Sequence, residues 1–270
     1  MPNAVTGDRP GSFLQALKVQ ARVLYGLLLR EASLRQGQYR IGHLLVLTEV
    51  LWTSLVVGVV WYVIGHPPPY GDSIVFYMFT GMFAFTLYRT IHTRVAAALD
   101  ANRGLLAYPI VRPVDTLLAR AGLESAFQLT AFIVFSTGFI WAGYANFPAR
   151  PNELLLTIGI IILLGFGTGV TSMVLRSLWS AWATIDGMIA RTLFFVSGIF
   201  YQVEFLPPQV RDALSWNPLV HAVEWVRHCV FHGYTSQILD REYLMFWALG
   251  SSVFGLAMER LRRPRLLEQP

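Results

Sequence analysis

Long apolar segments recur along this chain at lengths that match the thickness of a lipid bilayer. A helix needs roughly 20 residues to cross the hydrocarbon core, and helix is favoured there because it satisfies its own backbone hydrogen bonds. The alternating pattern of a membrane β-strand is not seen in these segments. We therefore expect an all-α integral membrane protein with six transmembrane helices, at His43–Ile64, Ser73–Thr93, Leu117–Tyr144, Glu153–Leu175, Ala183–Tyr201 and Tyr243–Met258.

The segment before the first predicted span, residues 12–35, has the pattern of an amphipathic helix. Apolar residues such as Phe13, Leu17 and Leu28 alternate with basic ones. This mixed pattern is unlike a secretory signal peptide, in which a continuous apolar run lies within roughly the first 15–30 residues. We expect an interface helix on the cytoplasmic membrane face. The alternative is a helix packed on a partner subunit.

The segment between the fifth and sixth spans, Gln202–Arg241, contains two short helical stretches, at Gln209–Ser215 and Leu219–Phe231. The longer stretch reaches only about 20 Å, too short to cross a bilayer. We therefore expect two short re-entrant helices, within residues 207–232, that dip into or lie on the outer leaflet. The second stretch pairs an apolar face with a polar face expected to stay out of the core, formed by His221, Glu224, Arg227 and His228.

Basic residues are concentrated on alternate connections between the predicted spans. The opposite connections are His66–Asp72 and Ala145–Asn152, and Arg150 is the single arginine or lysine in them. Because positive residues accumulate on the cytoplasmic side, both termini are predicted to lie in the cytoplasm. The basic residues of that side are Arg9, Lys18, Arg22, Arg30, Arg35, Arg40, Arg94, Arg103, Arg112, Arg176, Arg260, Arg262, Arg263 and Arg265.

Composition supports a membrane protein and limits its partners. Of 270 residues, 54% are hydrophobic and 14% are charged, whereas a soluble domain is about one-quarter charged. The net charge of +5 is largely explained by the positive cytoplasmic loops. We therefore expect no nucleic acid among the partners.

The side-chain chemistry argues against an enzyme. Lys18 is the single lysine, and it lies outside any glycine-rich loop of the kind that binds phosphates in a P-loop ATPase. The aspartates are isolated and Cys229 is the single cysteine, so we expect no catalytic residues and no bound metal or cofactor. ATP, if it is used, has to be bound by another subunit. The alternative of a different class is a membrane-embedded transferase acting on lipid-linked sugars.

Arg89 and Arg191 lie well inside the predicted spans, where ionisable groups are costly and commonly functional. Arg89 is in the inner half of the second span, and Arg191 is in the middle of the fifth. They form either a cationic lining for an anionic substrate or internal ion pairs with Glu49 or Asp186. A further charged pair, Arg120 and Glu124, is expected to neutralise itself across one helical turn.

Aromatic residues repeat along the same spans. Those at the outer ends, such as Tyr62 and Tyr201, fit the aromatic belt of a membrane interface. Trp52, Tyr77 and Tyr88 lie deeper, where a polar ring atom needs a partner; a sugar conduit and tight helix packing would use them equally well. The candidate conduit residues are Trp52, Tyr62, Tyr77, Tyr88, Arg89, Arg191, Phe195 and Tyr201.

Four stretches resemble the permease subunits of type-2 ATP-binding-cassette (ABC-2) exporters, specifically those that export capsular polysaccharide. They are Leu27–Arg35, Gly104–Asp115, Ser197–Tyr201 and Asn217–His221, and they follow one another in the family's order. One departure is Val50, where many members carry a proline after the glutamate. A proline there would bend the first span locally, so the departure bears on that bend and not on the family resemblance.

The resemblance implies how the protein assembles. Such permeases form homodimers, and each copy pairs with a separate nucleotide-binding subunit that binds ATP and Mg. Residues 102–113 would then form a cytoplasmic coupling segment, and residues 12–35 would also meet the ATPase. The residues implied in this coupling are Arg30, Glu31, Arg103, Tyr108, Pro109 and Arg112.

The resemblance also implies a substrate and a location. It indicates a bacterial inner-membrane permease, a single domain over residues 1–270, that translocates lipid-linked capsular polysaccharide. The first and fifth spans would border a lateral gate for the lipid end of the polymer. A periplasmic adaptor and an outer-membrane polysaccharide exporter would complete the route. Export of O-antigen or teichoic acid is the alternative within the same class.

Overall fold

The computed structural model describes residues 20, 22, 25–29, 42–99 and 113–268, and these form helices joined by turns and loops, without a strand. The coupling segment expected at residues 102–113 lies outside these ranges except for Pro113. Of the interface helix expected at residues 12–35, residues 20, 22 and 25–29 are described, and they are helical. The elements are α2 (Gly42–Val63), α3 (Ile74–Ala96), α5 (Pro113–Trp141), α6 (Pro151–Leu178), α7 (Trp182–Val196), the 3-10 turn η1 (Val203–Phe205), α8 (Pro208–Leu214), α9 (Pro218–Val230) and α10 (Arg241–Glu268).

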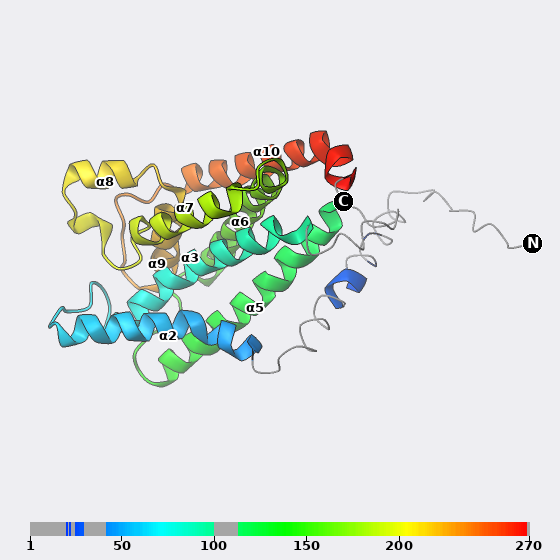
Figure 1. Ribbon diagram of the computed structural model, residues 1–270. Helices are drawn as coiled ribbons and strands as arrows, with labels where there is room; N and C mark the ends of the chain where they lie inside the picture. Colours follow the sequence, from blue (N-terminus) through cyan, green and yellow to red (C-terminus); the bar gives the residue numbers. More distant parts are fainter. Residues whose placement is uncertain (1–19, 21, 23–24, 30–41, 100–112, 269–270) are drawn as a thin grey trace, which may run out of the picture.

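The long helices run side by side as a bundle (Figure 1). Helix α3 lies between the α6–α10 pair and the α2–α5 pair, and it contacts α2, α5, α6 and α9. One end of the bundle carries α8 and the long connections around it, and we call it the α8 end. The other end carries the C-terminus.

Three of the described helices are long and apolar enough to cross a membrane: Ile74–Ala96, Val114–Trp141 and Pro151–Leu178. A shorter apolar helical stretch, Val50–Val63, belongs to α2. These helices confirm that the chain is built from membrane-length apolar helices. The later boundaries differ from those expected from the sequence.

Helix α7 ends earlier than the expected fifth span, Ala183–Tyr201. It stops at Val196, and Gly198 follows in the left-handed backbone region with φ of +71°. Residues with a Cβ atom disfavour this conformation, whereas glycine adopts it readily. Gly198 therefore allows the chain to turn out of the helix. Helix α10 is longer than expected, since it begins at Arg241 and continues past Met258 to Glu268.

Close packing at small residues joins α6 to α10. A Cβ atom on Gly167 would overlap the backbone of Ser251 and Ser252. A Cβ on Gly255 would lie 2.7 Å from the Gly167 carbonyl oxygen. The Ser252 hydroxyl also donates a 3.0 Å hydrogen bond to the carbonyl oxygen of Leu163. Within lipid, such van der Waals and polar contacts stabilise helix pairs, because apolar burial alone does not.

Both short helical stretches predicted after the fifth span are present, as α8 and α9. Proline at the first position and an Asn217 cap start α9, and the Asn217 side chain accepts a 3.0 Å hydrogen bond from the Leu219 amide. However, the prediction that the polar face of α9 stays out of the core was wrong. Glu224 and Arg227 are both 0% exposed, and His221 is 2% exposed.

The polar face of α9 is buried because other segments supply partners for it. Arg227 donates 2.7 Å hydrogen bonds to the carbonyl oxygens of Gly198 and Ile199, in the turn that follows α7. It also forms a 3.1 Å ion pair with Glu224 and lies 3.9 Å from the centre of the Tyr77 ring. Thus Arg227 fastens α9 to α3 and to the turn that ends α7.

Candidate functional site

A cluster of charged side chains surrounds Asp186, near the start of α7. Asp186 is buried. Its Oδ2 accepts a 2.7 Å hydrogen bond from Arg176 at the end of α6. Its Oδ1 lies 2.9 Å from His92 Nε2 and 3.6 Å from Arg89 Nη1, both on α3. A carboxylate can only accept hydrogen bonds, so His92 donates from Nε2. Asp186 therefore joins α3, α6 and α7.

The charges in this cluster do not cancel. Asp186 carries one negative charge, whereas Arg89 and Arg176 both keep their positive charges at any physiological pH. The Nε atom of Arg176 is buried without a hydrogen-bond partner among the described residues. The Arg89 side chain is 26% exposed, and its ion pair is longer than a hydrogen bond. An excess of positive charge therefore remains on the Arg89 side of the cluster.

Arg89 opens onto a cavity of about 490 Å³ between α3, α6, α7 and α10, which we call the Asp186 cavity. The walls are mainly apolar and aromatic. A pocket of this size with a few polar groups at one place is the usual form of a small-molecule site. The aromatic residues of its walls are Phe85, Tyr88, Trp182, Phe246, Trp247 and Phe254.

Of the candidate conduit residues, the structure brings Tyr88 and Arg89 together in the Asp186 cavity. The ion pair of Arg89 with Asp186, one of the two interpretations left open by the sequence, is present at 3.6 Å. The side chain of Glu49 lies outside the described part of the structure. Arg191 is exposed on α7 and does not line this cavity.

The other candidate conduit residues lie elsewhere. Trp52 and Tyr62, on α2, are 67% and 75% exposed, and Phe195, on α7, is 64% exposed. Tyr201 is half-buried, and its hydroxyl donates a 3.3 Å hydrogen bond to the carbonyl oxygen of Phe195. Tyr77 is completely buried beneath Arg227, so it offers no surface to a passing substrate in this structure.

The residues implied in ATPase coupling, Arg30, Glu31, Arg103, Tyr108, Pro109 and Arg112, all lie outside the described residues. Among the described residues at the C-terminus end of the bundle, Glu124 is buried and forms a 3.1 Å ion pair with Arg94. The helical spacing also predicts Arg120 as a partner of Glu124, and that pairing stays a prediction. Arg120 donates a 3.4 Å hydrogen bond to the Ala97 carbonyl oxygen.

Sequence reasoning missed Arg176, His92 and Trp182 as members of the site. Trp182 donates a 3.0 Å hydrogen bond to the Ser172 hydroxyl and thereby fixes the start of α7 against α6. One signal was present in the sequence: Arg89 and His92 are three residues apart and so share a helix face. Their common carboxylate partner, however, lies 94 residues beyond His92.

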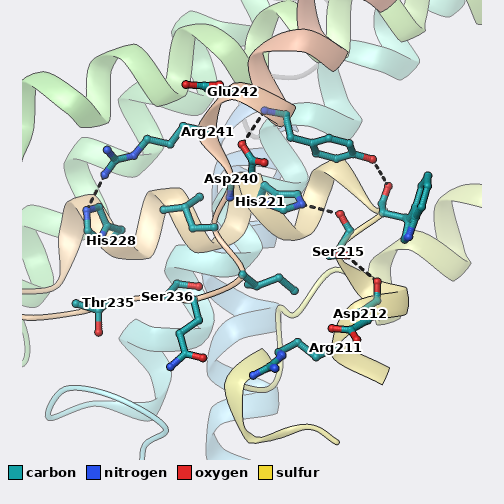
Figure 2. Close-up of a pocket in the computed structure, with 15 residues that line it drawn as sticks. Arg211, Asp212, Ser215, His221, His228, Thr235, Ser236, Asp240, Arg241 and Glu242 are labelled. Carbon is teal, nitrogen blue, oxygen red and sulfur yellow. Dashed lines mark hydrogen bonds between the residues drawn. The ribbon is translucent and has the colours of Figure 1, made fainter. Parts of the chain in front are cut away.

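A second, more polar pocket of about 1060 Å³ lies at the α8 end, between α8, α9 and the start of α10 (Figure 2). His221 and His228 border it. The amide of Asp240 donates to His221 Nδ1 at 3.0 Å, so His221 Nε2 donates to the carbonyl oxygen of Ser215. His228 Nε2 lies 2.9 Å from Arg241 Nη2. These bonds tie α9 to the connections on either side of it.

Arg241 also joins α10 to α6 at this end. Its Nη2 lies 2.7 Å from Glu153 Oε1, in the first turn of α6. The same oxygen accepts a 2.8 Å hydrogen bond from the Trp225 indole. Arg241, which lines the second pocket, is therefore occupied in holding α6 and α10 together.

Comparison with known proteins defines the class of this chain. The family model of the ABC-2 type transporter matches residues 22–231. The chain therefore belongs to the ABC-2 transporter membrane family. This family assignment agrees with the membrane-length helices and with the resemblance found in the sequence.

The individual relatives are named for polysialic acid transport or for capsule polysaccharide export. The chain is 31% identical over 252 residues to the polysialic acid transport protein KpsM of Escherichia coli, covering 93% of this chain and 97% of KpsM. It is 29% identical over 247 residues to the capsule polysaccharide export inner-membrane protein CtrC of Neisseria meningitidis serogroup B, covering 92% and 93%. It is 27% identical over 252 residues to the corresponding protein BexB of Haemophilus influenzae, covering 93% and 95%.

Proposed function

We propose that this chain is the permease subunit of an ABC exporter that moves lipid-linked capsular polysaccharide across the bacterial inner membrane. The observation that carries the proposal is similarity over more than nine-tenths of the chain to KpsM, CtrC and BexB. The match to the ABC-2 family and the membrane-length helices support it. ATP and Mg belong to a separate ATPase subunit, so this chain is not itself an enzyme.

In this proposal the membrane is crossed six times. Helices α2, α3, α5, α6 and α10 form five of the spans, and the segment Ala183–Tyr201, in which the 15-residue α7 is extended by the turn that follows it, forms the sixth. Helices α8 and α9 are re-entrant, since their 7 and 13 residues are too few to span a bilayer. The α8 end faces the periplasm and both termini face the cytoplasm. The support is the positive charge at the C-terminus end, where the described basic residues include Arg94, Arg176, Arg260, Arg262 and Arg263.

The working assembly contains two copies of this chain and two copies of the ATPase subunit. Helices α2 and α7 both have exposed faces, and the α7 face includes Arg191. An arginine facing lipid at this depth is costly, whereas a second copy or a water-filled conduit accommodates it. We assign Trp52, Tyr62, Arg191, Phe195 and Tyr201 to this shared conduit. A periplasmic adaptor and an outer-membrane exporter receive the polymer.

The alternative polymers, O-antigen and teichoic acid, are less favoured because the relatives are named for polysialic acid and capsule export. A membrane-embedded transferase for lipid-linked sugars is less favoured because the chain matches a transporter family. The two functions predict different fates for the polymer when the gene is deleted.

The test is a gene deletion in an encapsulated host, with complementation from a plasmid. We expect polymer to be made but to accumulate inside the cell, and the ATPase subunit to co-purify with the plasmid-encoded chain. Surface polymer is measured by antibody or lectin binding and total polymer by chemical analysis. Loss of total polymer would favour the transferase, and unchanged surface polymer would remove the export function.

A further inference from the structure

The Asp186 cavity differs from a sugar site in how its polar groups are used. Three hydroxyl groups on its walls already donate to backbone carbonyl oxygens at 2.8–3.2 Å, and the Trp182 indole donates to Ser172. A sugar needs many free hydrogen-bonding partners, and a buried polar group without a partner is costly. The hydroxyl groups already bonded in this way belong to Thr168, Thr171 and Ser251.

Arg89 is the group of this cavity best placed to bind a ligand. Its guanidinium has five N–H donors in a planar fork, and its contact with Asp186 through Nη1 is only a loose one. Asp186 does not repel an incoming anion strongly, because Arg176 and His92 hold its two oxygens at 2.7 and 2.9 Å. A single acidic group, such as a phosphate, therefore fits beside Arg89.

The rest of the cavity accepts hydrocarbon. Ile189 and Leu193 of α7 line it together with Phe246 and Phe254 of α10. Ile189, Phe246 and Phe254 are strongly exposed, so the cavity opens on the flank of the bundle between α7 and α10. In a bilayer this opening faces the acyl chains of neighbouring lipids. A ligand can therefore enter from the membrane rather than from water.

We propose that the Asp186 cavity binds an anionic lipid, with its phosphate on Arg89 and part of a hydrocarbon chain between α7 and α10. The phosphate can come from two sources: a bulk membrane phospholipid, or the lipid end of the exported polymer. The second source rests on the proposed function, whereas lipid binding itself does not. The chemistry is the same in both cases, and the experiment separates the sources.

The first arm measures binding to the purified permease–ATPase complex in detergent. The probes are phosphatidylglycerol and phosphatidylcholine that carry the same photoreactive acyl chain. We expect phosphatidylglycerol to label peptides of α7 and α10. Phosphatidylcholine should label them about tenfold less, because its choline cation would lie next to the excess positive charge of Arg89 and Arg176. Equal labelling by both lipids, or labelling outside α7 and α10, would overturn the proposal.

Variants test the two parts of the cavity separately. Arg89→Gln should reduce phosphatidylglycerol labelling about tenfold, and Arg89→Lys should restore part of it because the charge returns. Gly250→Trp should block the hydrocarbon part. Gly159→Trp is its matched control. Gly159 and Gly250 are both helical glycines at which an added Cβ atom would meet nothing within 4 Å, but only Gly250 lines the cavity. Full labelling of the Gly250→Trp complex would contradict the proposed position.

The second arm identifies the source of the lipid. The complex is purified from cells that make the polymer and from cells in which polymer synthesis is blocked, and retained lipids are identified by mass spectrometry. The same phospholipid in both preparations assigns the site to bulk lipid. A sugar-bearing lipid only in the first assigns it to the polymer. Anionic lipid in neither would overturn the proposal, while surface polymer, measured on the same cells, reports on export independently.

Discussion

At the scale of single residues, Arg227 shows how a charge is tolerated inside this bundle. Two carbonyl oxygens, one carboxylate and one aromatic face surround its guanidinium. Removing one partner of such a buried pair leaves the other unpaired, which is more costly than replacing both. Glu224 keeps one further partner, the Tyr234 hydroxyl, at 2.7 Å.

We predict that Arg227→Met destabilises the folded protein by roughly 3–5 kcal/mol, because Glu224 is left buried without its ion pair. The measurement is thermal unfolding of the purified protein in detergent, with the folded fraction that remains after heating read by size-exclusion chromatography. Arg211→Met is the control, since Arg211 on α8 is partly exposed and its loss should cost little. Equal stability of the two variants would show that the Arg227 cluster contributes nothing specific.

Cys229 gives a second prediction at this scale. Burial disfavours the thiolate and raises the pKa of the Cys229 thiol to about 11. At pH 7.5 the thiol is therefore almost entirely protonated as well as inaccessible, so N-ethylmaleimide should not modify it in the folded protein. We expect labelling only after denaturation in sodium dodecyl sulfate. Rapid labelling of the native protein, detected by mass spectrometry, would contradict the burial of α9.

At the scale of elements, helix existence was predictable and helix burial was not. Apolar length alone indicated α3, α5 and α6, and the Asn217-Pro218 pair indicated the start of α9. The burial of Glu224 and Arg227 depends on Gly198 and Ile199 in another segment. Local periodicity carries no information about such distant partners, so a charged face was mistaken for an exposed one.

The α6–α10 crossing gives a prediction at the element scale. Gly167→Leu should prevent these helices from reaching their packed distance, because even a Cβ atom overlaps the backbone of α10. The expected cost exceeds the roughly 1–3 kcal/mol typical of overpacking, since backbone rather than a flexible side chain is in the way. Recovery of monodisperse protein from membranes is the measurement. Gly159→Leu, on the same helix with open space around it, should be recovered normally.

At the scale of the whole molecule, the sequence indicated the components of the candidate site but not their assembly. Arg89, Tyr88 and Asp186 were each identified, yet only the packing of α3 against α6 and α7 shows that they share one cavity. Trp52, Tyr62 and Phe195 remain on exposed faces of the single chain. Their assignment to a conduit depends on a second copy, which one chain cannot supply.

The proposed orientation of the molecule leads to a prediction about which end faces the periplasm. Thr235, in the connection before α10, is exposed at the α8 end, and Arg262 is exposed near the C-terminus. We expect a membrane-impermeant maleimide to label Thr235→Cys in cells whose outer membrane is permeabilised, and Arg262→Cys only after lysis. The positive-inside pattern is the physical reason, because cytoplasmic loops retain arginine.

The native chain provides the background for this experiment, since its single cysteine, Cys229, is buried. Unmodified protein should therefore give no signal in either condition, and each introduced cysteine reports on one end alone. Labelling of Arg262→Cys in unlysed cells, with protection of Thr235→Cys, would invert the orientation. It would then place the Asp186 cluster, which lies toward the end of α6 and the start of α7, in the periplasmic half of the membrane. An inverted molecule would meet its ATPase with the α8 end, so this measurement tests the export proposal as well as the topology.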